Sequence, residues 1–159
     1  IEHVKQIFPD LPASILLLDN SGLHLKHAVS TGLPDFYNQA MDNLEIGPSV
    51  GSCGAAAFTG KQIIVEDIEH HPNWQPFLKL TRRAGLRACW SEPIKNTLGR
   101  VIGTFAIYNT VPALPNAEDL QVLEDTARET GLVLDRRQVV DTLRQNEEQL
   151  RLILNLFCF

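Results

Sequence analysis

The sequence predicts an α+β domain followed by one long helix, and three observations support this prediction. Short apolar runs bounded by turn residues alternate with amphipathic segments along most of the chain, as in domains that mix strands and helices. Residues 101–108 are largely apolar at both parities, which predicts a central strand covered on both faces. From Asn116 onward the pattern is helical without interruption.

The pattern of apolar residues in the N-terminal part of the chain predicts a helix, a β-hairpin and a second helix. Residues 1–8 carry apolar side chains at helical spacing and are followed by a proline. Two apolar runs, residues 13–18 and 23–29, flank a turn cluster of Asp, Asn, Ser and Gly, and together they predict a β-hairpin. Residues 33–44 have a proline near their start and apolar side chains on one face, which predicts an amphipathic helix.

The middle of the chain continues this alternation after a loop punctuated by three glycines. The boundaries of the expected helices and strands follow from glycines that end helices, from prolines, and from changes in the spacing of apolar residues. In chain order we expect a short helix at 53–59, a strand at 62–65, an amphipathic helix at 73–84 and strands at 86–91 and 101–108.

The C-terminal helix has two parts. Asn116 is a suitable N-cap, and an apolar stripe through Leu123 and Ala127 can pack on the domain. Beyond residue 136 the spacing tightens to 3-4-3-4, which predicts a coiled-coil seam and a homodimer; Asn146 would fix its register and oligomeric state. A solvated tail helix remains the alternative. The seam residues are Val139, Leu143, Asn146, Leu150, Ile153 and Phe157.

Composition narrows the class of protein. The 159 residues, 44% of them hydrophobic, suit one domain with additional helix. A net charge of −5 argues against a nucleic-acid partner, and no apolar run is long enough to insert into a membrane. Three cysteines without C-x-x-C spacing suit a reducing compartment, so we expect a cytoplasmic location.

Two cysteines are candidate site residues. Cys53 lies next to Gly54 where a helix is expected to begin, and the helix dipole would favour its thiolate. Alternatively, these are small residues that allow a tight turn. Cys89 lies in a predicted strand, where free cysteine is commonly a small buried hydrophobic residue. A redox couple of the two cysteines remains open, since it depends on geometry.

The other candidates are charged or aromatic. Asp67 ends a strand and can bind a ligand or cap the next segment. Arg87 suits an anionic group, with an ion pair as the competing use. Aromatic residues can line a cavity or simply fill the core; those considered are Trp74, Trp90, Phe105 and Tyr108.

No catalytic set or metal-ligand set is recognisable, and the cofactor is unknown. His70 and His71 are adjacent, with no further ligand at a usual spacing, and favour a surface loop. His24 and His27 are separated by an odd number of residues and would point to opposite faces of a strand. Haem ligation by one of the five histidines remains open.

Five segments of the chain carry a family resemblance: ASILLLD from Ala13, GSCGAAA from Gly51, IVEDI from Ile64, LRACWSEPI from Leu86 and LGRVIGTFA from Leu98. Together they resemble the GAF domain. That resemblance implies a central antiparallel sheet with helices on both faces and a ligand cavity beside the shorter helices. The ligand-binding residues it suggests here are Cys53, Gly54, Asp67, Trp74, Arg87, Cys89, Trp90, Ser91, Phe105 and Tyr108.

The resemblance implies a function as well. Residues 1–136 would be a non-enzymatic GAF module of a bacterial signalling protein, a sensor histidine kinase or a cyclic-di-GMP-turnover protein, that senses a small molecule or a redox change. Residues 137–159 would be a signalling helix that leads to an output or PAS domain. The sequence patterns of cyclic-nucleotide-binding and bilin-binding members are missing. An enzyme resembling free methionine-sulfoxide reductase and a ligand-free dimerisation scaffold are the alternatives.

Overall fold

The computed structural model of the chain describes residue 6 and residues 8–157, so the helix expected at residues 1–8 falls almost entirely outside them. Six strands form one antiparallel sheet in the order β3-β2-β1-β6-β5-β4. The strands are β1 (Ala13–Leu18), β2 (His24–Thr31), β3 (Leu44–Glu45), β4 (Ile63–Val65), β5 (Ala88–Lys95) and β6 (Val101–Asn109).

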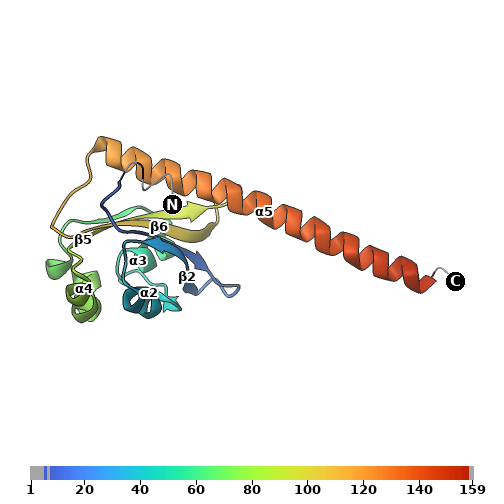
Figure 1. The fold of residues 1–159 in the computed structure, drawn as a ribbon, viewed down its shortest axis with the longest axis horizontal. Helices are drawn as coiled ribbons and strands as arrows, with labels where there is room; N and C mark the ends of the chain where they lie inside the picture. Colours follow the sequence, from blue (N-terminus) through green and yellow to red (C-terminus); the bar gives the residue numbers. More distant parts are fainter. Residues whose placement is uncertain (1–5, 7, 158–159) are drawn as a thin grey trace.

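Helices cover both faces of this sheet, as Figure 1 shows. The shorter helices lie on one face, and the first part of α5 crosses the other face before the helix extends beyond the sheet. The predicted α+β fold with an antiparallel sheet, helices on both faces and a long C-terminal helix is therefore confirmed. The helices are α2 (Asp35–Met41), α3 (Cys53–Thr59), α4 (Leu78–Ala84) and α5 (Ala117–Phe157), with 3-10 turns η1 (Ile68–His70) and η2 (Pro72–Phe77).

Two predicted helices differ from the observed ones. The segment at 73–84 is a 3-10 turn followed by α4, because Pro76 has no backbone N–H to donate inside a helix. The helix at 33–44 is shorter, since Asp42 is already extended (φ −71°, ψ 133°) and Asn43 adopts a left-handed φ of 66°. This turn directs the chain into β3.

Strand alternation divides the core into two layers. Along β5, Cys89 contributes to the layer beneath α2, α3 and α4, whereas Trp90 and Ile94 contribute to the layer beneath α5. Tyr108 of β6 joins Cys89 in the first layer. The central strands therefore contact short helices on one face and the long helix on the other.

The start of α5 is capped and closely docked. Asn116 and Asp119 exchange side chain–backbone hydrogen bonds of 2.9 and 2.8 Å, which form a capping box. Gly131 faces the end of β5 so closely that an added Cβ would collide with the carbonyl oxygen of Lys95. One turn later, the Asp135 carboxylate accepts a hydrogen bond of 2.6 Å from the backbone N–H of Thr97.

Candidate functional site

Buried sulfur and hydroxyl groups meet between the sheet and α3. The Sγ of Cys53 lies 3.2 Å from the Oγ of Ser91 and 3.9 Å from the Oη of Tyr108. The Sγ of Cys89 lies 3.7 Å from the same Ser91 hydroxyl, and Ser14 contacts the Tyr108 hydroxyl at 3.3 Å. We call these five residues, all 5% exposed or less, the thiol–hydroxyl cluster.

Small residues allow α3 to bring Cys53 into the cluster. Gly51 has a left-handed φ of 53°, which favours glycine, and it faces the indole ring of Trp74. At Gly54 an added Cβ would come within 2.8 Å of the Cβ of Val50, so a larger residue would displace the loop. The alternative that Gly54 is a packing residue is thus consistent with its surroundings.

A second set of hydrogen bonds holds this end of α3 in place. The indole Nε1 of Trp74 donates to the Oγ of Ser52 at 3.1 Å. The Ser52 hydroxyl donates in turn to the backbone carbonyl of Cys89 at 3.5 Å. Because Ser52 and Trp74 are both buried, these bonds fix α3 relative to η2 and β5.

The two thiols differ in acidity. The pKa of Cys53 is lowered from 9.0 to about 7, first by its hydrogen bond with Cys89 and then by the hydroxyls around it, against the effect of burial. The pKa of Cys89 is raised well above its usual value, chiefly by burial. Burial also raises the pKa of Tyr108, so its hydroxyl stays protonated and able to donate. Cys53 is therefore the more nucleophilic thiol.

Two further hydroxyls at the cluster have no hydrogen-bond partner within the described residues. They are the Oη of Tyr37 and the Oγ1 of Thr104, and both side chains are buried. The Tyr37 ring packs edge-on against Tyr108 with centroids 5.7 Å apart. An unpaired buried hydroxyl costs about 1–3 kcal/mol, so these groups favour any polar molecule that can bond them.

Asp67 and Arg87 bind each other outside the cluster. The Arg87 guanidinium lies 3.1 Å from the Asp67 carboxylate, which also accepts from the backbone N–H of Glu69 and so caps η1. The pKa of Asp67 is lowered, first by its hydrogen bond with His70 and further by Arg87. Asp67 thus caps the next segment and Arg87 forms an ion pair, which are the alternatives to ligand binding for these two residues.

Trp90 and Phe105 lie on the other face of the sheet from Cys53. Both belong to the layer beneath α5, and the indole N–H of Trp90 donates to the carbonyl of Ala113 at 3.0 Å. The prediction that Trp90 and Phe105 line the same site as Cys53 is therefore wrong, because the sheet separates them from Cys53. Neighbouring residues of a strand point to opposite faces, so Cys89 and Ser91 cannot share a face with Trp90.

Four polar residues in or beside the cluster are not among the candidates predicted from the sequence: Ser14, Tyr37, Ser52 and Thr104. Ser14 and Thr104 are hydroxyl residues inside otherwise apolar strands, and both are buried. A buried hydroxyl in such a strand needs a partner. Strand parity combined with this requirement was a signal that could have found them.

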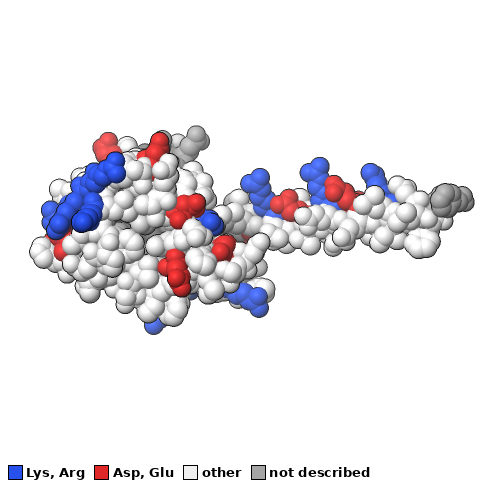
Figure 2. Space-filling model, turned by 90° about the horizontal axis from the view of Figure 1, so that it is seen from below, with Lys and Arg blue, Asp and Glu red and all other residues white. Residues whose placement is uncertain are grey.

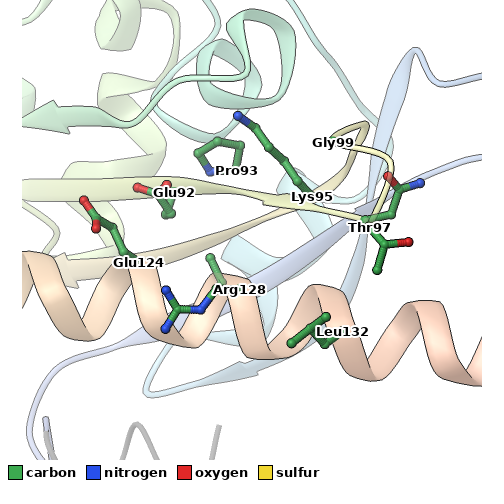
Figure 3. Close-up of a pocket in the computed structure, with 10 residues that line it drawn as sticks. Glu92, Pro93, Lys95, Thr97, Gly99, Glu124, Arg128 and Leu132 are labelled. Atoms are coloured by element: carbon green, nitrogen blue, oxygen red, sulfur yellow. The ribbon is translucent and has the colours of Figure 1, made fainter.

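Open grooves of the surface lie elsewhere, along α5. One of about 370 Å³ lies between α5 and the end of β5 (Figure 3), where Glu92 and Glu124 face each other from strand and helix. Burial, and to a smaller extent Glu124, raises the pKa of Glu92. None of the ten ligand-binding residues suggested by the sequence lines the three grooves found on this side. The cluster itself is buried, with each of its five side chains 5% exposed or less.

The part of the chain that the structure describes contains neither a metal-ligand cluster nor a membrane-spanning helix. Within residues 8–157 and residue 6, no three side chains of His, Cys, Asp or Glu come together as a metal site would require. In the same residues, no helix combines the length and apolar character needed to cross a bilayer.

Comparison with known proteins identifies the family. The sequence matches the GAF domain over residues 1–135, and the chain therefore belongs to the GAF domain family. A relative in Methanosarcina acetivorans, the methyl sulfide methyltransferase-associated sensor, is 29% identical over 155 residues. These residues are 98% of this chain but only 16% of that relative's length.

Solved structures show the same fold. A domain described as part of a two-component sensor histidine kinase protein from Sinorhizobium meliloti superposes with a TM-score of 0.75 at 22% identity, over 91% of each chain. The type II free methionine-R-sulfoxide reductase of Thermoplasma acidophilum has a TM-score of 0.63 at 19% identity, over 82% of this chain and 83% of that one. At these identities the likeness extends to the fold alone.

Proposed function

We propose that this chain is the sensory GAF module of a signalling protein. A small molecule or a redox change acts at the thiol–hydroxyl cluster, and α5 transmits the response to a dimeric partner and an output domain. The module itself performs no catalysis. The observation that carries this proposal is the position of β5, whose residues alternate between the cluster and α5.

A change at the cluster has a short path to the long helix. Cys89 and Ser91 belong to the cluster, while Trp90 between them packs in the layer beneath α5. Since the strand is continuous, a displacement that accommodates a ligand on one face moves the contacts on the other. A ligand shifts this equilibrium only by its differential affinity for the two arrangements.

Native mass spectrometry with absorption spectroscopy of the purified chain tests ligand binding. We expect the mass of the purified chain to include a bound small molecule, or its spectrum to show a chromophore. We also expect Ser91→Ala to weaken the retention of that molecule. Hydrogen exchange at the docked part of α5 should differ between the bound and the stripped protein. A bare mass with no absorption beyond the aromatic side chains, together with unchanged exchange, would favour the dimerisation scaffold.

The parent protein is a separate part of the proposal. One relative is described as a sensor and one fold neighbour as part of a sensor histidine kinase. We therefore propose a cytoplasmic sensor kinase as the context of this module, with a bacterial cyclic-di-GMP-turnover protein as the second choice. Fusion of the chain to a known kinase output, with activity followed as the cluster is mutated, tests this assignment.

An enzyme remains the second candidate because two thiols meet in the cluster and a free methionine-R-sulfoxide reductase shares the fold. An NADPH- and thioredoxin-coupled assay with free methionine sulfoxide decides between the two. We expect no turnover above background. Turnover that Cys89→Ser abolishes would replace the sensor proposal by the enzyme.

A further inference from the structure

We propose that Cys53 and Cys89 form a reversible disulfide within one chain, which makes the thiol–hydroxyl cluster a peroxide-responsive switch. This inference rests on the proposed sensory function and names one signal for it. The thiols belong to separate elements, α3 and β5, so a bond between them changes how a helix packs on the sheet.

Geometry is the first argument. Both sulfur atoms contact the same Ser91 hydroxyl, at 3.2 Å from Cys53 and 3.7 Å from Cys89. Both cysteines are free and buried. Cys89 is also the neighbour with the largest lowering influence on the pKa of Cys53. Their shared contact with Ser91 places the two sulfurs around one hydroxyl, and a disulfide requires them to approach each other to about 2.05 Å.

The difference between the thiols gives each a separate role. Cys53, with its pKa lowered to about 7, carries a substantial thiolate fraction at neutral pH. Cys89, whose pKa is raised by burial, keeps its proton. The thiolate is the form that attacks an oxidant, so Cys53 reacts first and Cys89 resolves the product.

The surroundings suit an uncharged oxidant. Thiols and hydroxyls make up the cluster, and none of its five residues is Asp, Glu, His, Lys or Arg. Hydrogen peroxide is neutral, close to water in size, and both donates and accepts hydrogen bonds. The unpartnered hydroxyls of Tyr37 and Thr104 offer such bonds. Because Cys53 is only 5% exposed, peroxide must enter through a local opening, and the reaction is expected to be slow.

The chemistry balances with peroxide as the only oxidant. The Cys53 thiolate attacks one peroxide oxygen, the O–O bond breaks, and an S–O bond forms as hydroxide leaves and takes up a proton to give water. The Cys89 sulfur then attacks the sulfenic sulfur of Cys53. An S–S bond forms, the S–O bond breaks, and the departing oxygen leaves as water with the Cys89 proton. Two thiols are oxidised and one peroxide is reduced to two waters.

The disulfide also explains how a signal would reach α5. A covalent S–S bond of about 2.05 Å is shorter than any non-bonded contact between two sulfurs, so its formation draws the start of α3 toward β5. Trp90 lies next to Cys89 and packs on the opposite face with Ile94 beneath α5. A shift of β5 therefore changes the surface on which α5 rests.

The test uses the full chain with Cys158→Ser, which leaves only the two cluster thiols. After treatment with hydrogen peroxide at pH 7, neither thiol should react with an alkylating reagent, and the mass of the chain should fall by that of two hydrogen atoms. Peptide mapping without reductant should recover a linked pair of peptides that contain Cys53 and Cys89, and dithiothreitol should restore both thiols. Two thiols that stay alkylatable after denaturation, or oxidation of Cys53 to sulfinic acid with Cys89 still reduced, would overturn the inference.

Single variants separate the two roles. In the same background, Cys89→Ser should accumulate a sulfenic acid at Cys53 that dimedone traps, whereas Cys53→Ser should leave Cys89 unreacted at the same peroxide concentration. Ser91→Ala should slow disulfide formation several-fold, and Ser49→Ala, an exposed serine, should not. If Cys89 oxidises at the normal rate without Cys53, the assigned order is wrong and the switch is rejected.

Hydrogen exchange of α5 distinguishes failure of this inference from failure of the proposed function. A disulfide that forms without any change in α5 exchange keeps the thiol chemistry but removes its role in sensing, and so rejects the switch. A bound metabolite that alters α5 exchange, in a protein whose thiols resist peroxide, supports the sensor and overturns the disulfide.

Discussion

Cys53 and Cys89 show how position sets the chemistry of two identical side chains. Both are buried, yet the pKa of Cys53 falls to about 7 because donors surround its sulfur, while burial dominates at Cys89 and raises its pKa. Cys89 and Ser91, the two largest influences that lower the pKa of Cys53, are both neutral groups. The acidity of Cys53 therefore depends on the local hydrogen bonds and not on a nearby cation.

Ser91 is the donor that can be tested most directly. In the Cys158→Ser background, Ser91→Ala should raise the pKa of Cys53 because it removes the second-largest influence that lowers it. The pH at which thiolate absorbance appears in the ultraviolet reports that pKa. Ser14→Ala is the control, since Ser14 bonds Tyr108 and not Cys53. An identical titration in both variants would show that Ser91 does not stabilise the thiolate.

Ser52 should matter for stability. Ser52→Ala leaves the buried indole N–H of Trp74 without its acceptor, and an unsatisfied buried donor costs about 1–3 kcal/mol. We expect the free energy of unfolding in urea to fall by about that amount. The exposed Ser49→Ala serves as the reference and should change it by about 0.5 kcal/mol or less. Equal stability of the two variants would mean that Trp74 finds another partner.

At the scale of the element, α5 depends on one glycine for its close approach. Glycine within a helix normally costs about 1 kcal/mol relative to alanine, so Gly131→Ala would stabilise an exposed helix. Here the added methyl group would collide with the carbonyl oxygen of Lys95, and overpacking of this kind costs about 1–3 kcal/mol. We therefore expect a lower unfolding free energy, while Glu129→Ala on the exposed side leaves it nearly unchanged. Stabilisation by Gly131→Ala would contradict the close packing.

The turn η1 should make stability sensitive to acid. In the folded state the pKa of Asp67 is lowered, first by His70, below the ordinary value of about 3.9. Its stabilising effect is therefore complete above the unfolded pKa and is lost as the pH falls through the folded one. Asp67→Asn should be less stable than wild type at pH 7 and lose less stability between pH 5 and pH 2. Thermal unfolding across this range measures the effect, and parallel curves would contradict it.

The sequence predicted the elements better than it predicted the sides they face. Residues 13–18 coincide with β1, and the central strand ends within one residue of the expected position. Cys53, Cys89 and Ser91 are all among the ligand-binding candidates predicted from the sequence, and the structure places these three side chains in contact. The sequence could not separate Trp90 from them, because an apolar strand buried on both faces has no polar side that reveals its parity.

At the scale of the whole molecule, α5 changes character near residue 135. Up to Asp135 it packs on the sheet, and the family match ends at the same residue. Beyond it the seam residues are exposed, with Leu143 and Leu150 at 63% and 59%. On the face that Figure 2 shows, the charged side chains of the projecting part lie toward one edge, and the opposite edge is uncharged. A protein does not usually leave such a stripe on a helix without a partner.

Asn146 tests whether a second copy of the chain covers this stripe. A polar residue at a core position of a coiled coil restricts the oligomeric state at some loss of stability. Asn146→Leu should therefore raise the thermal stability of the assembly and shift its sedimentation from dimer toward larger species. Gln145→Leu adds the same side chain about 100° away around the helix and should leave the dimer unchanged. Sedimentation as a monomer by all three proteins, the wild type included, would show that α5 does not pair with itself and that the signal leaves the domain through a different partner.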